Sequence, residues 1–179
     1  FEQETSMTTV LAVDLGSASG RVLAGTLTDG RLDVTDIHRF KHEARRRQDG
    51  TLTWDVATME AETIIGLKKA LEQFPDARSV SIDTWGVDWA PLDENGDLVG
   101  DVIAYRDERT SRTLDAFHER IGDREFFDLT GNQPATINTA NQLFAYLQEN
   151  PADAQRVAGV LFLPDYFVYR LTGAVGWSR

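Results

Sequence analysis

The hydrophobic positions near the start of the chain are typical of short β-strands. The continuous apolar run over residues 10–13 ends in Asp14-Leu15-Gly16, and its short length and β-branched content favour a strand buried on both faces over a helix. Ser17-Ala18-Ser19-Gly20 then predicts a tight turn into a second strand over residues 21–27.

The pattern continues with Asp29-Gly30, which predicts a hairpin turn. The third strand begins at Leu32, and its alternation slips near Asp36, before Ile37, which predicts a bulge or the end of the strand. The chain is therefore expected to open with a three-stranded antiparallel meander. Residues 42–50 contain three consecutive arginines and are interpreted as a solvated loop.

A helical period follows the meander. Asp55 is a favourable N-cap, and Phe74-Pro75 predicts the end of the helix. Its expected buried stripe is Val56, Met59, Thr63, Leu67 and Leu71. Further along, the pattern predicts a strand over 80–85, an extended run over 87–92 and a hairpin at Asn95-Gly96. Two helices follow, one after Thr110 and one with the apolar stripe Ala140, Leu143, Phe144 and Leu147. The last predicted elements are a strand over 160–163 and a helix that begins at Pro164 and ends at Gly173. Three antiparallel strands before a helical crossover predict a mixed α/β sheet flanked by helices.

Composition narrows the class of protein. The chain has 179 residues, 41% apolar and 26% charged, which suits a globular domain. Its net charge of −11 disfavours non-specific nucleic-acid binding, although backbone amides can still hold a small anion. No apolar run reaches the roughly 20 residues of a membrane helix, and zero cysteines exclude disulfides, thiolate zinc sites and a cysteine nucleophile. Residues 1–6 are polar, carry no targeting signal and are interpreted as a cloning remnant, with the cytoplasm as the expected location.

Residues 14–21 are the first candidate site. Small side chains would let a phosphate approach the peptide N–H groups, and the hydroxyls of Ser17 and Ser19 would add donors. Asp14 would face the same point and could hold Mg²⁺ through water. An ordinary tight hairpin would explain the same glycines by backbone geometry. The spacing is not a Walker motif, and a strand follows where a dinucleotide fingerprint needs a helix.

The second candidate is Asp83-Thr84-Trp85-Gly86-Val87-Asp88-Trp89, which places two carboxylates and two indoles around one glycine. These groups could line a polyol pocket. The alternative is a core strand whose tryptophans pack and whose carboxylates cap turns. The polar string over residues 105–109 has two interpretations as well, a substrate contact or a surface ion-pair cluster.

Taken together, these motifs resemble the N-terminal half of the FGGY family of carbohydrate kinases, which share the actin and hexokinase type of ATPase domain. The resemblance covers residues 7–179 and implies a ribonuclease-H-like α/β domain, truncated before a C-terminal domain. It rests on the joint order of Val13-Asp14-Leu15-Gly16, Ser19-Gly20-Arg21, Thr53-Trp54-Asp55, Ile82 to Asp88, Ala104-Tyr105-Arg106-Asp107, Asn138-Thr139, Pro164-Asp165-Tyr166 and Tyr169 to Gly173. The Trp-Gly-Val-Asp string favours kinases of L-rhamnulose over glycerol kinases.

The resemblance implies transfer of the ATP γ-phosphoryl group to a ketose, with L-rhamnulose going to L-rhamnulose 1-phosphate as the favoured reaction. The residues that match the first ATP phosphate loop are Ser17, Ala18, Ser19, Gly20 and Arg21. Asp14 matches the carboxylate near Mg²⁺. Gly86 matches a substrate contact, with Trp85 and Asp88 beside it, and Asn138 falls in a loop over the sugar.

The family's catalytic base, second phosphate loop and adenine pocket are expected beyond Arg179, so no catalytic residue is assigned within this chain. We therefore expect weak or absent kinase activity from the chain alone. Three alternatives stay open: a kinase of the family acting on L-fuculose, D-xylulose or a related polyol; a non-catalytic nucleotide-binding module of the same fold; and a fragment that self-associates through a face which a second domain would cover.

Overall fold

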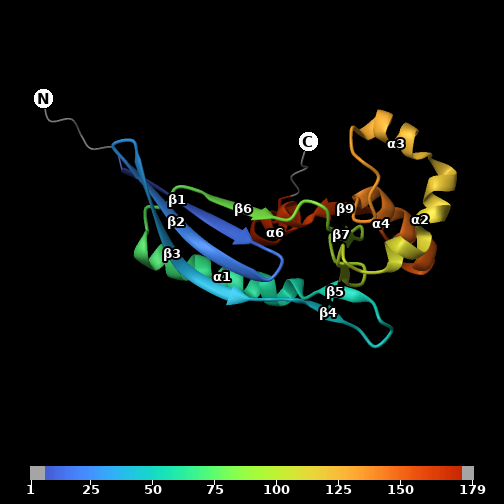
Figure 1. Ribbon diagram of the computed structural model, residues 1–179. Coiled ribbons are helices and arrows are strands. Elements are labelled where there is room, and N and C mark those ends of the chain that lie inside the picture. The colour runs from blue at the N-terminus through green and yellow to red at the C-terminus, as the bar shows by residue number, and fades with distance from the viewer. Residues whose placement is uncertain (1–6, 175–179) are drawn as a thin grey trace, which may run out of the picture.

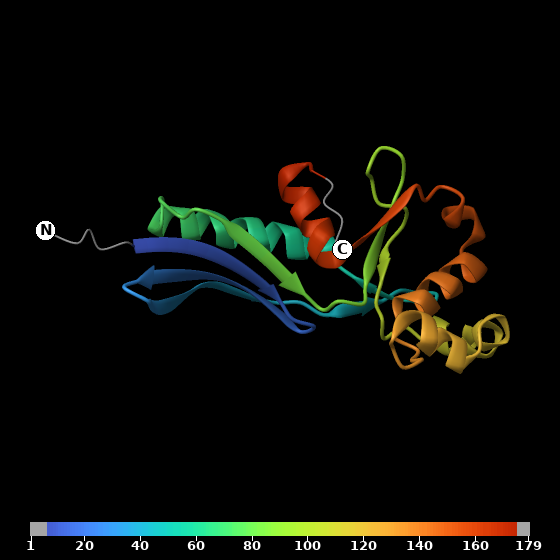
Figure 2. The same ribbon diagram turned by 90° about the horizontal axis from the view of Figure 1, so that it is seen from above.

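A four-stranded mixed sheet forms the centre of residues 7–174, the part of the chain that this computed structural model describes. Its strands stand in the order β3 (Arg31–Lys41), β2 (Ser19–Thr28), β1 (Met7–Leu15) and β6 (Val80–Thr84). The first three form an antiparallel meander, and β6 lies parallel to β1. Helix α1 (Val56–Gln73) makes the crossover and covers one face of the sheet (Figure 1 and Figure 2). The expected mixed α/β sheet is confirmed.

The slip in the alternation of β3 is a β-bulge. Val22 pairs with His38. The next residue of β2, Leu23, pairs with Asp36, so Ile37 is the extra residue of the bulged strand. On the face that α1 covers, the meander buries Leu11, Val13, Leu15, Val22 and Ala24. The expectation that the first strand is buried on both faces is wrong, because Val10 on the opposite face is 39% exposed.

Helix α1 begins where the sequence predicts. The Asp55 side chain accepts a hydrogen bond from the backbone N–H of Thr58 at 3.0 Å, which satisfies one of the free donors of the first turn. The predicted buried stripe is wrong at its last position, because Leu71 is 49% exposed and Ala70 is buried in its place.

Two small sheets extend the structure from the end of the main sheet. One contains β4 (Ala44–Arg46), β5 (Leu52–Trp54) and β8 (Val102–Ile103), and the other pairs β7 (Trp89–Leu92) with β9 (Gly159–Phe162). The interpretation of residues 42–50 as a solvated loop is wrong in two respects: three of them form β4, and His42 is buried. The arginine side chains remain in solvent while the backbone pairs, and the Arg45 guanidinium lies 2.6 Å from the Asp55 carboxylate.

Beyond these sheets, most of the remaining helices gather in a lobe at one end of the molecule (Figure 1). They are α2 (Arg109–Arg120), α3 (Asp123–Thr130), α4 (Thr139–Glu149) and α5 (Pro151–Ala154), while α6 (Leu163–Thr172) returns to pack beside β6. The sequence pattern did not predict α3 or α5. The expected apolar stripe of α4 is also wrong: Leu147 is 59% exposed, and the helix buries Asn141, Gln142, Ala145 and Tyr146.

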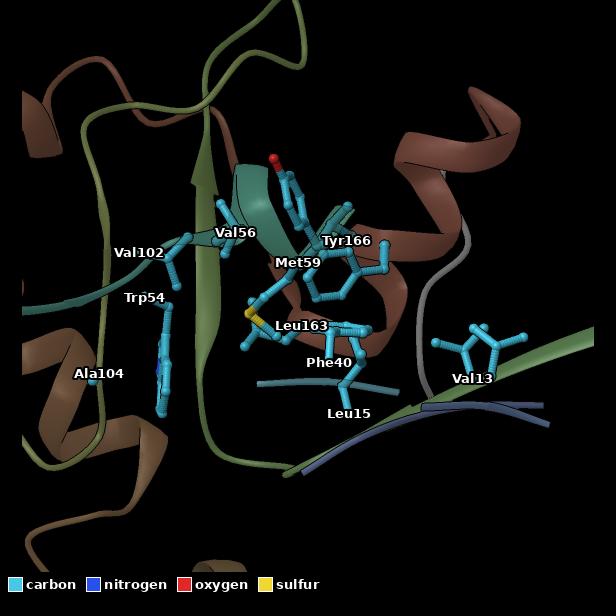
Figure 3. Packing of buried hydrophobic residues seen from close by; sticks show 14 of the residues in the cluster. Val13, Leu15, Phe40, Trp54, Val56, Met59, Val102, Ala104, Leu163 and Tyr166 are labelled. Atoms are coloured by element: carbon cyan, nitrogen blue, oxygen red, sulfur yellow. The ribbon is translucent and has the colours of Figure 1, made fainter. Parts of the chain in front are cut away.

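The hydrophobic core lies between the sheet, α1 and α6. Met59 of α1 lies among the side chains of Leu15, Phe40, Leu163 and Tyr166 (Figure 3). This core fixes the end of the sheet at which β1 and β6 finish. Across residues 7–174, no helix has both the length and the apolar content to cross a membrane.

Candidate functional site

The two candidate motifs lie at one edge of the main sheet. Because β1 and β6 are parallel, their carboxyl ends meet at the same edge. The glycine turn follows β1, and the segment 85–88, which we call the Trp85 segment, follows β6. Leu15 pairs with Thr84 in the register, so the last residue of each strand lies beside the other. The structure thus brings together two motifs about seventy residues apart in the sequence.

The glycine turn presents its backbone to solvent. The Gly16 N–H donates to the Ser19 carbonyl at 2.9 Å, and the Ala18 carbonyl accepts from the His42 backbone N–H at 3.3 Å. Within residues 7–174, the N–H groups of Ser17 and Ala18 donate to no protein acceptor. Adjacent amides of this kind can hold an anion. A hollow of about 360 Å³ opens beside Ala18, and its lining carries both charge signs, with the cationic Lys41 and Arg45 and the anionic Glu43 and Asp55.

Asp14 and Arg21 face each other across β1 and β2. The Arg21 Nε donates to the Asp14 Oδ2 at 2.7 Å, and a terminal guanidinium nitrogen lies 2.5 Å from the same oxygen. Both side chains are partly exposed, and only one carboxylate oxygen is engaged. A single half-exposed carboxylate suits Mg²⁺ held through water, since Mg²⁺ keeps much of its hydration. Within residues 7–174, no cluster of three acidic or histidine side chains could enclose a metal directly.

Gly20 is explained by packing. It is buried, and a Cβ at this position would lie 2.2 Å from the Phe40 ring. The glycine therefore lets Phe40 close the core beneath the turn. Its predicted ATP contact would have to come from the peptide backbone and remains a prediction.

Asp88 is fully buried and holds two indoles. One oxygen, Oδ2, accepts hydrogen bonds from the Trp54 Nε1 at 2.5 Å and the Trp85 Nε1 at 2.7 Å. Burial raises the pKa of the Asp88 carboxyl, and the two indole donors and the Arg109 charge oppose that shift. The predicted substrate contact at Asp88 could act only through the indole that it anchors, since none of its surface is exposed.

The Trp85 ring connects the two motifs through His42. The His42 imidazole stacks on Trp85 with ring centroids 6.1 Å apart, and the two indoles of Trp54 and Trp85 lie 4.5 Å apart. Burial lowers the pKa of His42, while the nearby carbonyls of Gly16 and Ser19 act in the opposite direction. A neutral imidazole therefore lies between the glycine turn and the Trp85 segment.

Gly86 is exposed, and a Cβ built on it would meet nothing within 4 Å. A ligand could approach the backbone closely at this point. Trp89, the second indole of the motif, lies in the core instead, edge-on to Tyr146 with ring centroids 5.1 Å apart. For Trp89 the core interpretation is correct.

Asn138 lies close to the Trp85 segment, although 50 residues separate them. The Val87 carbonyl accepts from the Thr139 hydroxyl at 2.9 Å and from the Gln142 side-chain amide at 3.0 Å. These bonds join the start of α4 to the residue after Gly86. The Asn138 Nδ2 donates to the Gln133 carbonyl, which orders the loop over residues 133–138.

Sequence reasoning assigned no role to His42, Gln142 or Trp54. The Thr-Trp-Asp motif was a signal for Trp54, but its indole bond to Asp88 spans 34 residues. Gln142 is polar and lies outside the predicted apolar stripe of α4, so the hydropathy pattern gave no sign that its side chain is buried.

The mixed sheet with its α1 crossover is the fold of sugar kinases. Residues 9–177 match the N-terminal domain of the FGGY family of carbohydrate kinases, and the chain belongs to that family. Among solved structures, xylulose kinase from Rhodospirillum rubrum superposes with a TM-score of 0.79 at 19% identity, over 92% of this chain and 34% of that one. Plasmodium falciparum glycerol kinase with ADP superposes with a TM-score of 0.76 at 15% identity, over 99% and 40%.

Curated relatives are closer in sequence. A rhamnulokinase from Mannheimia succiniciproducens is 40% identical over 168 residues, which are 93% of this chain and 35% of the relative. A rhamnulokinase from Klebsiella pneumoniae is 41% identical over 170 residues, or 94% and 35%. The chain spans about a third of the length of these relatives.

Proposed function

We propose that this chain is the N-terminal domain of an ATP-dependent ketose kinase whose substrate is L-rhamnulose. The observation that carries the proposal is the shared sheet edge, where the amide-bearing turn after β1 lies beside the open Gly86 backbone after β6. Phosphoryl transfer needs the phosphates and the acceptor hydroxyl held together in line, and this edge offers a place for each. The two rhamnulokinase relatives support the choice of sugar.

On the phosphate side, the amides of Ser17 and Ala18 and the hydroxyls of Ser17 and Ser19 bind phosphate oxygens. Arg21 orients the Asp14 carboxylate, which would hold Mg²⁺ through water. When bound, Mg²⁺ neutralises charge on the phosphates. The glycerol kinase structure with ADP supports a nucleotide as the phosphate donor.

On the sugar side, the exposed backbone at Gly86 lets the ketose approach, and the Trp85 ring supplies an apolar face. Asp88 anchors that ring through the indole N–H. Asn138 donates one of its two amide N–H groups to the Gln133 carbonyl, which leaves its Oδ1 and its second N–H for sugar hydroxyls.

In the reaction, the acceptor oxygen forms a bond to the γ-phosphorus while the bond to the β-phosphate oxygen breaks. The hydroxyl proton goes to a carboxylate that we place in a second domain, beyond this chain. The chain's coverage of about a third of its relatives supports a further domain.

The test uses the full-length enzyme and a panel of ketoses with L-rhamnulose, L-fuculose and D-xylulose. We expect L-rhamnulose to give the highest kcat/KM, and Gly86→Leu to raise its KM at least about tenfold while the KM for ATP changes little. Gly122→Leu is the matched control, because its Cβ would also meet nothing within 4 Å, at the start of α3.

Three outcomes would contradict the proposal. A higher kcat/KM for L-fuculose or D-xylulose would move the enzyme to another substrate of the family. Nucleotide binding without phosphorylation of any ketose would indicate a non-catalytic module. An unchanged sugar KM in Gly86→Leu would show that the sugar binds elsewhere.

A further inference from the structure

We propose that Gln142 is a positioning residue for the sugar: it sets the separation of the Trp85 segment and the loop over residues 133–138, and with it the affinity and selectivity for the ketose. The inference rests on the proposed function, because it assumes that the sugar lies between these two segments. The Gln142 side chain makes no hydrogen bond to Gly86 or to the Asn138 side chain, and the Gln142 backbone N–H donates to the Asn138 carbonyl at 3.1 Å in the first turn of α4, so its effect is carried by the backbone that it holds.

The Gln142 amide group joins the two segments directly. Its Nε2 donates to the Val87 carbonyl at 3.0 Å and to the Ile137 carbonyl at 2.9 Å. Val87 follows Gly86, and Ile137 precedes Asn138, so each bond anchors the residue next to a proposed sugar contact. One side chain thus fixes both walls of the site relative to each other.

A third segment is attached through Arg109. The Gln142 Oε1 accepts from an Arg109 guanidinium nitrogen at 2.9 Å, and the other terminal nitrogen donates to the Ala104 carbonyl at 3.2 Å. Asp107 completes the attachment, because its carboxylate accepts from the Arg109 backbone N–H at 2.9 Å and from the Leu52 N–H at 2.7 Å. The segment over residues 105–109 is therefore connected, through Arg109 and Gln142, to the backbone at Val87 and Ile137.

Gln142 has no exposed surface, and each of its polar atoms has a partner. A buried amide costs free energy unless every bond is made, and a fully satisfied network specifies one arrangement of the backbone around it. The directional hydrogen bonds of the amide fix the positions of the Val87 and Ile137 carbonyls relative to each other and, through Arg109, that of the Ala104 carbonyl.

The same helices offer a control. Arg112 of α2 binds Glu149 of α4 through two bonds of 2.9 and 2.7 Å on the exposed side of the pair. Arg112→Gln breaks a contact between α2 and α4 without touching Val87 or Ile137. A milder variant is Thr139→Val, which keeps the side-chain shape and removes the second donor to the Val87 carbonyl.

The experiment measures ketose binding without ATP by calorimetry, and the KM values and kcat, for full-length wild type, Gln142→Met, Thr139→Val and Arg112→Gln. Each variant is checked for folding by its melting temperature. We expect Gln142→Met to weaken ketose binding about tenfold or more and to reduce discrimination between L-rhamnulose and D-xylulose, with the KM for ATP unchanged. We expect Thr139→Val to shift ketose binding two- to fivefold in the same direction, and Arg112→Gln to match wild type.

The outcomes separate this inference from the proposed function. If wild type binds a ketose, Gly86→Leu weakens that binding and a folded Gln142→Met does not, the positioning role is wrong and the proposed function stands. An equal loss of ATP and ketose affinity in a folded Gln142→Met would also overturn it, since that result indicates general damage. If wild type binds no ketose, the proposed function and this inference both fail. Should Gln142→Met not fold, Thr139→Val decides.

Discussion

Asp88 illustrates how burial changes the role of a residue. Its carboxylate stands among aromatic rings, and both indole N–H donors bind the same oxygen, Oδ2. Taking a carboxylate out of water is costly, so its pKa is raised despite both donors. The buried carboxylate lowers the stability of the fold, and its bond to the indole N–H fixes the position of the Trp85 ring.

The first prediction at this scale concerns Asp88→Ala and Asp88→Asn. Removing the carboxylate leaves two buried indole N–H groups unpaired, and we expect Asp88→Ala to lower the free energy of unfolding by about 3–5 kcal/mol. Asp88→Asn keeps one acceptor oxygen and should lose less. Urea denaturation measures both, and equal losses in the two variants would show that the indole bonds do not matter.

The sign of the pH dependence follows from the raised pKa of Asp88. A carboxyl whose pKa is higher in the folded state contributes stability below its unfolded value of 3.8, and that contribution is lost as the pH rises through the folded-state pKa. Wild type should therefore gain stability relative to Asp88→Asn as the pH falls from 7 toward 4. If the difference in unfolding free energy between wild type and Asp88→Asn stays constant from pH 7 to pH 4, the raised pKa of Asp88 is contradicted.

Residue identities alone suggested a chemical role for the turn, which stays a prediction, and did not predict how the turn packs. Asp14 and Arg21 were both assigned to the phosphate side, and the structure shows that they bind each other. Gly20 fitted a phosphate loop, yet the approach of Phe40 already requires it. Contacts between side chains from β2 and β3 depend on pairing across strands, which no local pattern records.

At the scale of elements, the meander and α1 were predictable because each has a strong period and a clear end. β4 was missed because its arginines are exposed and only its backbone is paired. α4 was predicted at the correct place but with the wrong buried face, since its buried side includes Asn141 and Gln142. Polar side chains that bind distant carbonyls look like surface residues in a hydropathy pattern.

The packing of α1 on the sheet gives a second prediction. A Cβ on Gly66 would lie 2.4 Å from the Val22 Cγ2 and 3.1 Å from the His38 Cβ. Gly66→Ala should favour the helix by about 1 kcal/mol but overpack the interface by about 1–3 kcal/mol, so we expect a net loss of stability. Thermal unfolding measures the change. Gly122→Ala, which has open space around it, is the control, and a stabilised Gly66→Ala would show that α1 can move away from β2 at little cost.

For the whole molecule, the sheet presents one face to α1 and leaves the opposite face uncovered (Figure 2). Val10, Leu27, Leu32 and Val34 are each between 39% and 60% exposed, and Val10 and Val34 both stand opposite Gly25 in the register. The proposed sites for phosphate and sugar lie along one edge of this half-covered sheet. In this arrangement the proposed phosphate site and the proposed sugar site both stay open to water.

The last prediction follows from that open arrangement. At the sheet edge, Asp14 is paired with Arg21 and Asp88 is fully buried, so neither is placed to take a proton from a sugar hydroxyl. A positioned base contributes about 10²–10⁴-fold to such a reaction, and exclusion of water contributes further. We therefore expect residues 7–179 alone to give less than about 1% of the turnover of the full-length enzyme with L-rhamnulose and ATP, measured by coupled ADP release. Size-exclusion chromatography at several concentrations identifies loss of activity through self-association on the apolar face. Normal turnover by the monomeric chain would place the base within it, and Asp83, exposed beside Asp14 in the register, would then be the first residue to replace.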